Sequence, residues 1–304
     1  MMKKFICFLV GLAMITSLIF IFRDYITEIY YDAVKYFSPI DIKLEKNEYY
    51  RDYDFNYVQN TADFEPENIN DIRNIFYTVI NSGQETFSFY CPDEYTTCTE
   101  DVKRLANDQE ELSHINNFVH PFNGFKHIET QYNSLGEVTI TIFKSYDKSM
   151  IEAIENKVDS VIASNIPATA TDVEKIKIIH DYIINNTRYD VDRSDRNIIN
   201  YKSDIAYGPL LQGFAICGGY SDAMQIFLER LGIKSYRIAS AAHIWNVVYV
   251  NGNWYHLDLT WDDPITTDGT QILDNKYFLI NTTTLHSLDT TEHIYDKSIY
   301  SEAI

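Results

Sequence analysis

Apolar and polar residues follow helical or strand periods through most of residues 67–146. One helical stripe predicts a helix over residues 67–81 and consists of Ile69, Ile72, Ile75, Phe76 and Val79. A second, mostly polar helix is predicted over residues 100–118, with an apolar side made of Val102, Leu105, Leu112 and Ile115. ETFSFY alternates as a strand between them, and KHIETQY and EVTITIF have the pattern of a hairpin. These elements predict a small α/β domain.

The segments before and after this domain follow other patterns. Residues 24–60 are aromatic and acidic without a clear period, which predicts a tether or surface arm. Residues 149–164 repeat apolar positions at helical spacing, and a short connector, NIPATAT, follows them. The sequence from Thr171 to Glu174 then has the T-x-x-E pattern of a capping box ahead of another helix. We place the domain limits at 1–24, 25–146 and 147–304, and assign no role to 25–146.

A cysteine followed by two glycines opens the next helical stripe. Apolar residues follow Cys217 at helical steps, and Gly232 stands where the helix is expected to end; the stripe consists of Tyr220, Ala223, Met224, Phe227, Leu228 and Leu231. Cys217 therefore belongs to the first turn of a buried helix. Unpaired backbone N–H groups and the helix dipole gather there and favour a thiolate. Gly218 and Gly219 leave room for backbone to approach a substrate closely.

Two aromatic runs flank Asn251-Gly252, which is a strong hairpin signal. A two-residue turn pairs Val250 with Asn253 and places Trp245 opposite Asp258. His243 then lies on the same face as Asp258, diagonal to it at about 7–8 Å between backbones. A three-residue loop would change the parity and separate the two side chains.

If the Cys217 helix packs on this face, a thiol, an imidazole and a carboxylate converge. A thiol with an ordinary pKa near 8.5 is mostly protonated at neutral pH, and an adjacent His243 can take its proton and store it for the leaving group. The Asp258 carboxylate would hold the ring in the useful tautomer. Backbone N–H groups at the helix start are candidates for an oxyanion hole, with Gln212 as a weaker one. We predict Cys217, His243 and Asp258 as the catalytic residues.

Other polar residues are expected to be structural. His180 belongs to a helical stripe, and His256 shares a face with Asp258 as a packing or supporting residue. Asp262-Asp263-Pro264 has the composition of a turn. His286 and His293 are too isolated to predict a zinc site. We therefore predict no metal site and no cofactor, an expectation that loss of activity in a chelator would contradict.

The N-terminus and the cysteines bear on location. Lys3-Lys4 precede an uncharged apolar run from Phe5 to Phe22, long enough for about 27 Å of helix against a hydrocarbon core of about 30 Å. Lysines before the run favour an exported body, so we expect a single-pass membrane anchor, with a cleaved signal peptide as the alternative. Cys91 and Cys98 are close enough for a loop-closing disulfide outside the cytoplasm; two buried thiols are the alternative.

The net charge of the chain narrows the choice of partners. Lys plus Arg number 25 against 44 Asp plus Glu, which gives a net charge of −19. A surface this acidic repels phosphate backbones, so nucleic-acid binding is disfavoured.

AICGGYSDAMQIFLERLGI, then HIWN, then NGNWYHLDLTWDDP resembles the bacterial transglutaminase-like superfamily. The order Cys, His, Asp matches, as do the small residues after the cysteine and the Trp-Asn after the histidine. The resemblance covers residues 172–277 and implies a papain-like α+β core, with the nucleophile helix packed on an antiparallel sheet. It implies Cys217 as nucleophile, His243 as general base and acid, and Asp258 as the orienting carboxylate.

The resemblance implies a thiol enzyme acting on amide or peptide bonds through a thioester, and the N-terminal apolar run places its expected action outside the cytoplasm. An amine acceptor would make it a transglutaminase, and water would make it a cysteine peptidase or amidase; the family holds both. A non-catalytic module that binds a surface or cell-wall polymer is the alternative outside enzymes. The expected partners are a protein or peptide substrate, surface or cell-wall material among them, and the membrane.

Overall fold

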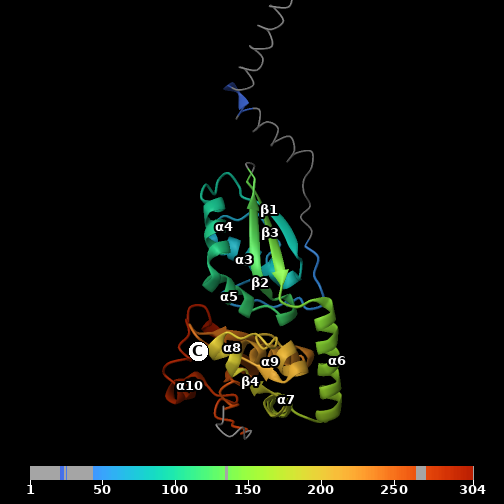
Figure 1. Ribbon diagram of the computed structural model, residues 1–304. Helices are drawn as coiled ribbons and strands as arrows, with labels where there is room; N and C mark the ends of the chain where they lie inside the picture. Colours follow the sequence, from blue (N-terminus) through green and yellow to red (C-terminus); the bar gives the residue numbers. More distant parts are fainter. Residues whose placement is uncertain (1–20, 24, 26–43, 134–135, 265–271, 304) are drawn as a thin grey trace, which may run out of the picture. The chain divides into compact units, whose positions relative to one another are not determined.

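The computed structural model describes residues 21–23, 25, 44–133, 136–264 and 272–303 (Figure 1). The chain divides into two compact units, and the larger one comprises Leu44–Tyr132 and Gly136–Ile304. The predicted boundary at residue 146 falls inside it and stays a prediction.

The first part of the unit is a three-stranded antiparallel sheet with helices. Its strands are ordered β1-β3-β2, drawn side by side in Figure 1. The elements are α3 (Ile69–Ser82), β1 (Thr86–Tyr90), α4 (Cys98–Asn107), α5 (Gln109–Asn117), β2 (Phe125–Tyr132) and β3 (Glu137–Lys144). The predicted hairpin is confirmed by the pairing of β2 with β3.

The prediction of one helix over residues 100–118 is wrong, because the segment forms the two helices α4 and α5. Asp108 ends the first and caps the second, with an extended backbone at φ −85°, ψ 94°. Its carboxylate accepts a hydrogen bond from the Glu111 backbone N–H at 3.0 Å. Aspartate side chains compete for backbone donors in this way, which favours a cap over a helix interior.

The prediction of a tether or surface arm is also wrong for the described part of residues 24–60. Arg51, Phe55 and Val58 are buried. The segment has no periodic pattern because side chains satisfy its irregular backbone, as where the Asn81 side-chain oxygen accepts from the Arg51 N–H at 3.1 Å.

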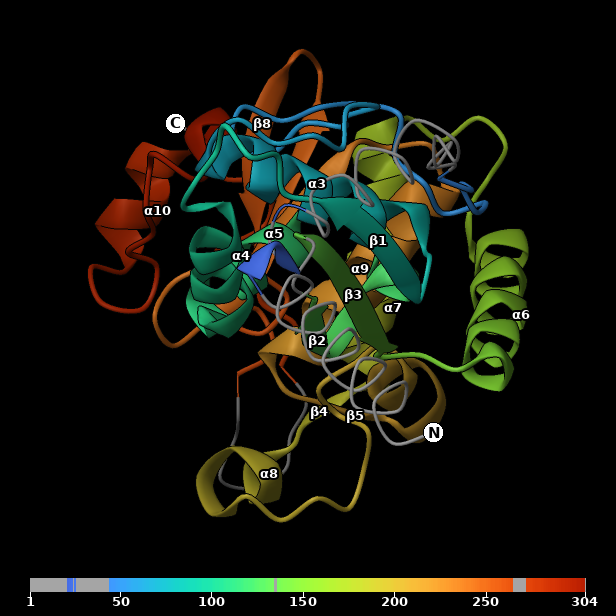
Figure 2. The same ribbon diagram turned by 90° about the horizontal axis from the view of Figure 1, so that it is seen from above.

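The remaining elements include helix α9, which begins at Cys217. In chain order they are α6 (Lys148–Asn165), α7 (Asp172–Asn186), β4 (Arg188–Tyr189), α8 (Val191–Arg196), a π-helical turn (Gly208–Gln212), β5 (Phe214–Ala215), α9 (Cys217–Arg230), β6 (Ser235–Ala239), β7 (Ile244–Val250), β8 (Asn253–Leu257) and α10 (Thr282–Leu288). Figure 2 shows α6 and α10 well apart, with α9 and α7 between them. The mixed α and β fold agrees with the predicted class.

Helix α9 packs against α7 on one side and against β6 and β7 on the other. Its apolar stripe joins one core cluster with α6, α7 and strands β7 and β8 of the β6-β7-β8 sheet. The predicted capping box of α7 is present, since Thr171 and Glu174 exchange hydrogen bonds with each other's backbone N–H. Gly232 follows α9 at φ 71°, the left-handed conformation expected at a helix end.

The hairpin of β7 and β8 has the predicted two-residue turn. Val250 pairs with Asn253, and the register continues to Asn246 opposite Leu257. Asn251 and Gly252 both have positive φ, as a type I′ turn requires. Asp258 therefore follows the last residue of β8, at the end where β7 begins.

Of the two features expected to indicate location, the structure shows the disulfide but leaves the membrane anchor untested. Cys91 and Cys98 form a disulfide, which resolves the choice between a disulfide and two thiols. Among the described residues, none of the helices has the length and apolarity needed to cross a membrane. Nearly all of the apolar run from Phe5 to Phe22 lies outside the described residues, so the predicted anchor stays a prediction.

Candidate active site

Cys217 is the first residue of α9 and the one free cysteine among the described residues. Ile216 before it is extended, and its N–H donates to the Ser203 carbonyl at 2.8 Å, which fixes the chain where it enters the helix. In the described part of the chain, no acceptor meets the N–H groups of Cys217, Gly218 and Gly219. The sulfur therefore lies beside unused donors and the positive end of the helix dipole.

The expected role of Gly218 and Gly219 was to let a substrate backbone approach. The structure corrects this, because the space beside both glycines is filled by the backbone of the 203–205 loop. A Cβ on Gly219 would lie 2.3 Å from the Ser203 carbonyl oxygen, and one on Gly218 would lie 2.7 Å from the Asp204 carbonyl oxygen. The glycines let the 203–205 loop pack on the first turn of α9. They hold the nucleophile in place rather than admit a substrate backbone.

His243 and Asp258 meet at the end of the hairpin, as the register predicts. His243 Nε2 lies 2.5 Å from Asp258 Oδ2, and both side chains are buried. Since Nε2 faces the carboxylate, the other ring nitrogen, Nδ1, is the one free to face the thiol. The structure thus brings Cys217, His243 and Asp258 together, since the Cys217 side chain lies near enough to His243 to help raise the pKa of the imidazole.

The charges of the site are set by this contact. Burial alone would lower the pKa of His243, but Asp258 and Cys217 raise it to about 10. Burial alone would raise the pKa of Asp258, yet His243 and His293 hold it well below its ordinary value. At neutral pH the site therefore contains an imidazolium and a carboxylate, and an imidazolium beside a thiol favours the thiolate.

Asp258 is held by four donors. Its Oδ1 accepts from the backbone N–H groups of Thr260 at 2.9 Å and Trp261 at 3.2 Å. Its Oδ2 accepts from His243 and from His293 Nε2, the latter at 2.8 Å. The carboxylate is thus fixed in one orientation and directed at His243.

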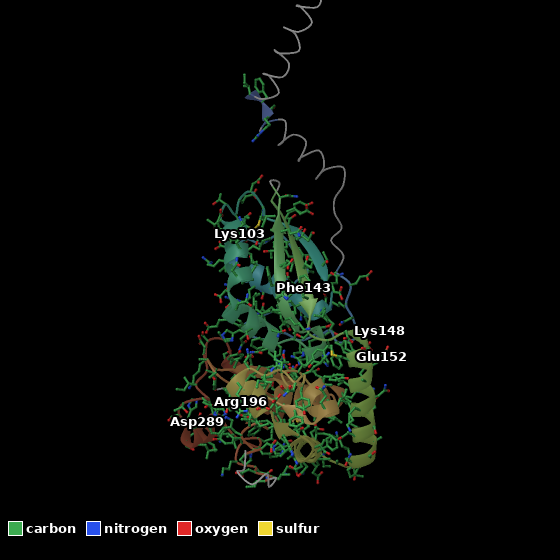
Figure 3. The ribbon with its side chains drawn as sticks, in the orientation of Figure 1. Lys103, Phe143, Lys148, Glu152, Arg196 and Asp289 are labelled. Atoms are coloured by element: carbon green, nitrogen blue, oxygen red, sulfur yellow. A yellow bond between two sulfur atoms is a disulfide. The ribbon has the colours of Figure 1, made fainter. Side chains whose placement is uncertain are left out.

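The sequence predicts no role for His293, which stands alone in it, but the structure places this residue beside Asp258. The residue is fully buried, and its Nδ1 lies 2.9 Å from Asp289 Oδ2. The only local signal was the four-residue spacing of Asp289 and His293. Their approach to Asp258 depends on tertiary packing, which pattern reasoning could not supply. Figure 3 labels Asp289 in the C-terminal segment that follows α10.

Aromatic rings enclose the histidines. Trp245 stacks on His243 at 5.6 Å between centroids, and Trp261 lies 6.4 Å from the same ring. The Trp245 N–H donates to His256 Nδ1 at 3.1 Å, which confirms His256 as a supporting residue. These rings keep water from the bond between His243 and Asp258, which strengthens it.

The distances among His243, Asp258 and His293 are those of hydrogen bonds. His243, Asp258 and His293 each offer a ligand atom, all within 4.8 Å of one another, a grouping that could suggest a metal. However, both nitrogens lie within 2.8 Å of one carboxylate oxygen, closer than the roughly 3.3 Å between ligands of a tetrahedral ion at about 2.0–2.1 Å. The arrangement fits a hydrogen-bonded chain better than a coordination sphere.

Two further groups bear on the surroundings of Cys217. Tyr189 of β4 pairs with Ala215, two residues before Cys217, and burial raises the pKa of its hydroxyl. Gln212 is exposed, and its side-chain oxygen accepts from the Lys202 backbone at 2.8 Å. The weaker oxyanion candidate is thus engaged elsewhere, and the N–H groups of α9 are the stronger one.

His180 is structural, as expected. It is fully buried, with Nε2 3.1 Å from Asp262 and Nδ1 2.9 Å from Asp181. Asp262 also accepts from the Tyr277 backbone N–H at 3.0 Å. His180 therefore fixes the turn that follows Asp258 to helix α7.

Comparison with known proteins agrees with the predicted resemblance over part of the chain. Residues 160–259 match the model of the transglutaminase-like superfamily, and this range contains Cys217, His243 and Asp258 but neither Asp289 nor His293. Among curated proteins the chain is similar to kyphoscoliosis peptidase of Homo sapiens, with 23% identity over 144 residues, 40% of this chain. The chain spans 21% of the length of that relative.

Among solved structures, one likeness is to a transglutaminase, described as "a TGase", with 15% identity, a TM-score of 0.33 and 48% of each chain covered. Another is to a putative cysteine protease from Cytophaga hutchinsonii, with 13% identity, a TM-score of 0.29, and 51% of this chain and 69% of that one covered. At these scores neither likeness bears on the details of the site.

Proposed function

We propose that this chain is a transglutaminase-like thiol acyl-transfer enzyme in which Cys217 attacks a carboxamide or peptide carbonyl. The observation that carries the proposal is the placement of Cys217 at the start of α9 beside His243, with Asp258 bonded to the far side of the imidazole. A cysteine with a purely structural role would not need this set of partners. The likeness of residues 160–259 to the superfamily supports the same reading.

Acylation follows from the charges. The Cys217 thiolate forms a bond to the carbonyl carbon, and the carbonyl oxygen becomes an oxyanion beside the free N–H groups at the start of α9. His243 is already protonated, since its pKa is about 10, and gives its proton to the leaving nitrogen. The C–N bond breaks, ammonia or an amine departs, and a thioester remains on Cys217.

Deacylation uses the same groups in reverse. Neutral His243 takes a proton from the acceptor while the acceptor attacks the thioester carbonyl, and the thiolate leaves. A primary amine yields an isopeptide bond, whereas water yields a carboxylic acid. The acceptor, rather than the Cys-His-Asp arrangement, decides between a transglutaminase and a peptidase or amidase.

We also propose that the enzyme acts on a protein or peptide outside the cytoplasm. The disulfide of Cys91 with Cys98 supports this, because disulfides persist mainly in oxidising compartments. The apolar run from Phe5 to Phe22 behind two lysines supports export or anchoring. Protease treatment of intact cells should digest the body of the chain; complete protection would contradict this location.

The test is release of ammonia from a glutamine-containing protein such as casein, with and without a primary amine such as monodansylcadaverine. We expect turnover in the wild type and a loss of at least about 10³-fold in Cys217→Ala. Incorporation of the amine identifies a transglutaminase, and ammonia or new N-termini without incorporation identify a hydrolase. A matched control is Ser221→Ala, since Ser221 lies one turn further along α9 and donates to the Gly218 carbonyl.

A non-catalytic binding module would give a different pattern. Cys217→Ala would then bind surface polymer as well as the wild type does, and neither protein would form a thioester with a peptide panel. That outcome would contradict the proposed enzyme.

A further inference from the structure

His293 lies behind the proposed Cys-His-Asp group, and the proposed function assigns it no step. Its two ring nitrogens face two different carboxylates, Asp258 at 2.8 Å and Asp289 at 2.9 Å. The ring is fully buried, so water does not compete for these contacts. Both hydrogen bonds of His293 therefore bear on its role.

The protonation of the ring follows from its partners. A carboxylate only accepts hydrogen bonds, so each nitrogen that faces one must carry a hydrogen. Asp258 has its pKa held well below the ordinary value, and so has Asp289, where burial opposes the shift and Thr291 and His293 cause it. With both carboxyls ionised, His293 must donate from Nδ1 and Nε2 together. An imidazole with two N–H groups is an imidazolium.

His256 offers a contrast within the same cluster. Its Nδ1 accepts from the Trp245 N–H at 3.1 Å, so its Nε2 carries the hydrogen and faces the Thr282 hydroxyl at 3.1 Å. That pattern describes a neutral ring. Burial lowers the pKa of His256 to about 3, and the neighbouring charge of His293 contributes to the drop.

Aromatic side chains surround His293 in a manner suited to a cation. Tyr277 stacks on the ring at 5.2 Å and 16°, while Trp245 and Trp261 lie 4.8 and 5.0 Å from it between centroids, with ring planes inclined at 70° and 64°. The π-faces of such rings attract a cation within about 6 Å. The remaining charged neighbour is His243, whose ring lies 5.2 Å away at 81°.

We propose that His293 is a charged positioning residue: an imidazolium, fixed by Asp289, that orients the Asp258 carboxylate toward His243 and offsets part of its negative charge. The proposal rests on the proposed function of Cys217. It completes a chain of alternating charge that runs through Cys217, His243, Asp258, His293 and Asp289. Without the second cation, the thiolate would face a less compensated carboxylate.

Spectroscopy tests the charge without reference to activity. The chain has eight histidines, so selective ¹⁵N-histidine labelling of the full chain gives a small set of ring signals that His293→Gln assigns. At pH 7 we expect both His293 nitrogens to resonate as protonated nitrogens. One protonated and one unprotonated nitrogen would mean a neutral ring and would overturn the proposal.

The pH profile of Cys217 alkylation tests the consequence for the site. His293→Gln keeps a donor toward Asp258 but removes the cation, so the acid limb of the profile should move upward by about half to one pH unit. Asp289→Asn should move the acid limb in the same direction. Without the Asp289 carboxylate beside Nδ1, the ring of His293 is no longer stabilised as an imidazolium. A profile that loses amplitude without moving would indicate a purely structural residue and would overturn the proposal.

His180→Gln is the matched control. His180 is also fully buried between two carboxylates, and it holds the same 258–263 loop, but it touches Asp262 instead of Asp258. We expect it to lower stability and leave the acid limb in place. If His293→Gln does not fold, Asp289→Asn still decides the question, because it shifts and so identifies the His293 ring signals and also gives the pH profile.

Failure of the proposed function has a separate signature. If His243→Ala leaves wild-type alkylation unchanged, the activation of Cys217 is wrong, whatever the ¹⁵N signals show. If alkylation depends on His243 but His293 is neutral, only the further inference fails.

Discussion

At the scale of single residues, the site is defined by the partners of the ring nitrogens of His243 and His293. His243 directs Nε2 at Asp258 and leaves Nδ1 for the thiol, while His293 directs both nitrogens at carboxylates. The first histidine can therefore lose and regain a proton during a reaction. The second one has no acceptor to which it could give a proton without losing a bond.

Asp263 gives a prediction at this scale. Its carboxyl is buried beside the Tyr220 hydroxyl, and burial raises its pKa from 3.8 to about 6. The folded state thus binds the proton more tightly than the unfolded chain. The stability from this group is full below about pH 4 and is lost as the pH rises through about 6.

Asp263→Asn keeps the neutral form at every pH. Relative to wild type, its free energy of unfolding should rise by about 1–3 kcal/mol between pH 4 and pH 7.5. Urea unfolding at the two pH values measures the change, with exposed Asp195→Asn as the baseline. An equal difference at both pH values would contradict the raised pKa.

Residue-level prediction from sequence succeeded where short-range geometry was enough. The side-chain period of two and the Asn251-Gly252 turn placed His243 beside Asp258. The same reasoning could not find His293, because it lies in an irregular segment and reaches Asp258 only through the packing of the C-terminal part. Nor could it see that the 203–205 loop occupies the space over Gly219.

At the scale of elements, the site depends on the junction between the start of α9 and the 203–205 loop. A Cβ on Gly219 would meet the buried Ser203 carbonyl at 2.3 Å, a distance at which backbone must shift. We expect Gly219→Ala to destabilise the protein by about 1–3 kcal/mol and to slow Cys217 alkylation, because the helix start moves.

Gly232→Ala is the control for this substitution. Nothing lies within 4 Å of its Cβ position, so only the positive φ of 71° is strained, at a cost of about 1 kcal/mol. Alkylation of Cys217 should be unchanged in this variant. Unfolding in urea and the alkylation rate are measured side by side, and equal alkylation in both variants would contradict the role of the junction.

Elements with a strong local signal were predicted well, and boundaries set by side chains were not. The capping box of α7, the glycine after α9 and the β7–β8 turn each have a short sequence signature. The break between α4 and α5 occurs because the Asp108 side chain caps the start of α5. The apolar periodicity of the segment does not reveal such a cap.

At the scale of the compact unit, buried polar contacts join the first sheet region to the nucleophile helix. Arg51 donates to the Phe118 carbonyl at 2.6 Å and pairs with Glu229 of α9 at 2.6 Å. Arg237 of β6, which is buried, pairs with Asp222 on α9 and also donates to the carbonyl of Asn116 in α5. The described residues after 44 should therefore unfold as one cooperative unit.

Arg51→Ala tests this coupling. Removing one partner of a buried ion pair typically costs about 3–5 kcal/mol, so unfolding in urea should shift strongly and in one transition. Arg230→Ala is the matched control, because its pair with Asp159 at 2.7 Å is half exposed and is worth less than about 1 kcal/mol. Two separate transitions in the wild type would contradict a single unit.

The chemistry proposed for the whole molecule depends on activation of Cys217 by His243. It is tested most directly by the iodoacetamide alkylation rate of Cys217 from pH 5 to 10, followed by peptide mapping, in the wild type and in His243→Ala. We predict fast alkylation that persists well below pH 8 in the wild type and a slower, ordinary thiol profile in the variant. Identical ordinary profiles in two folded proteins would contradict the account.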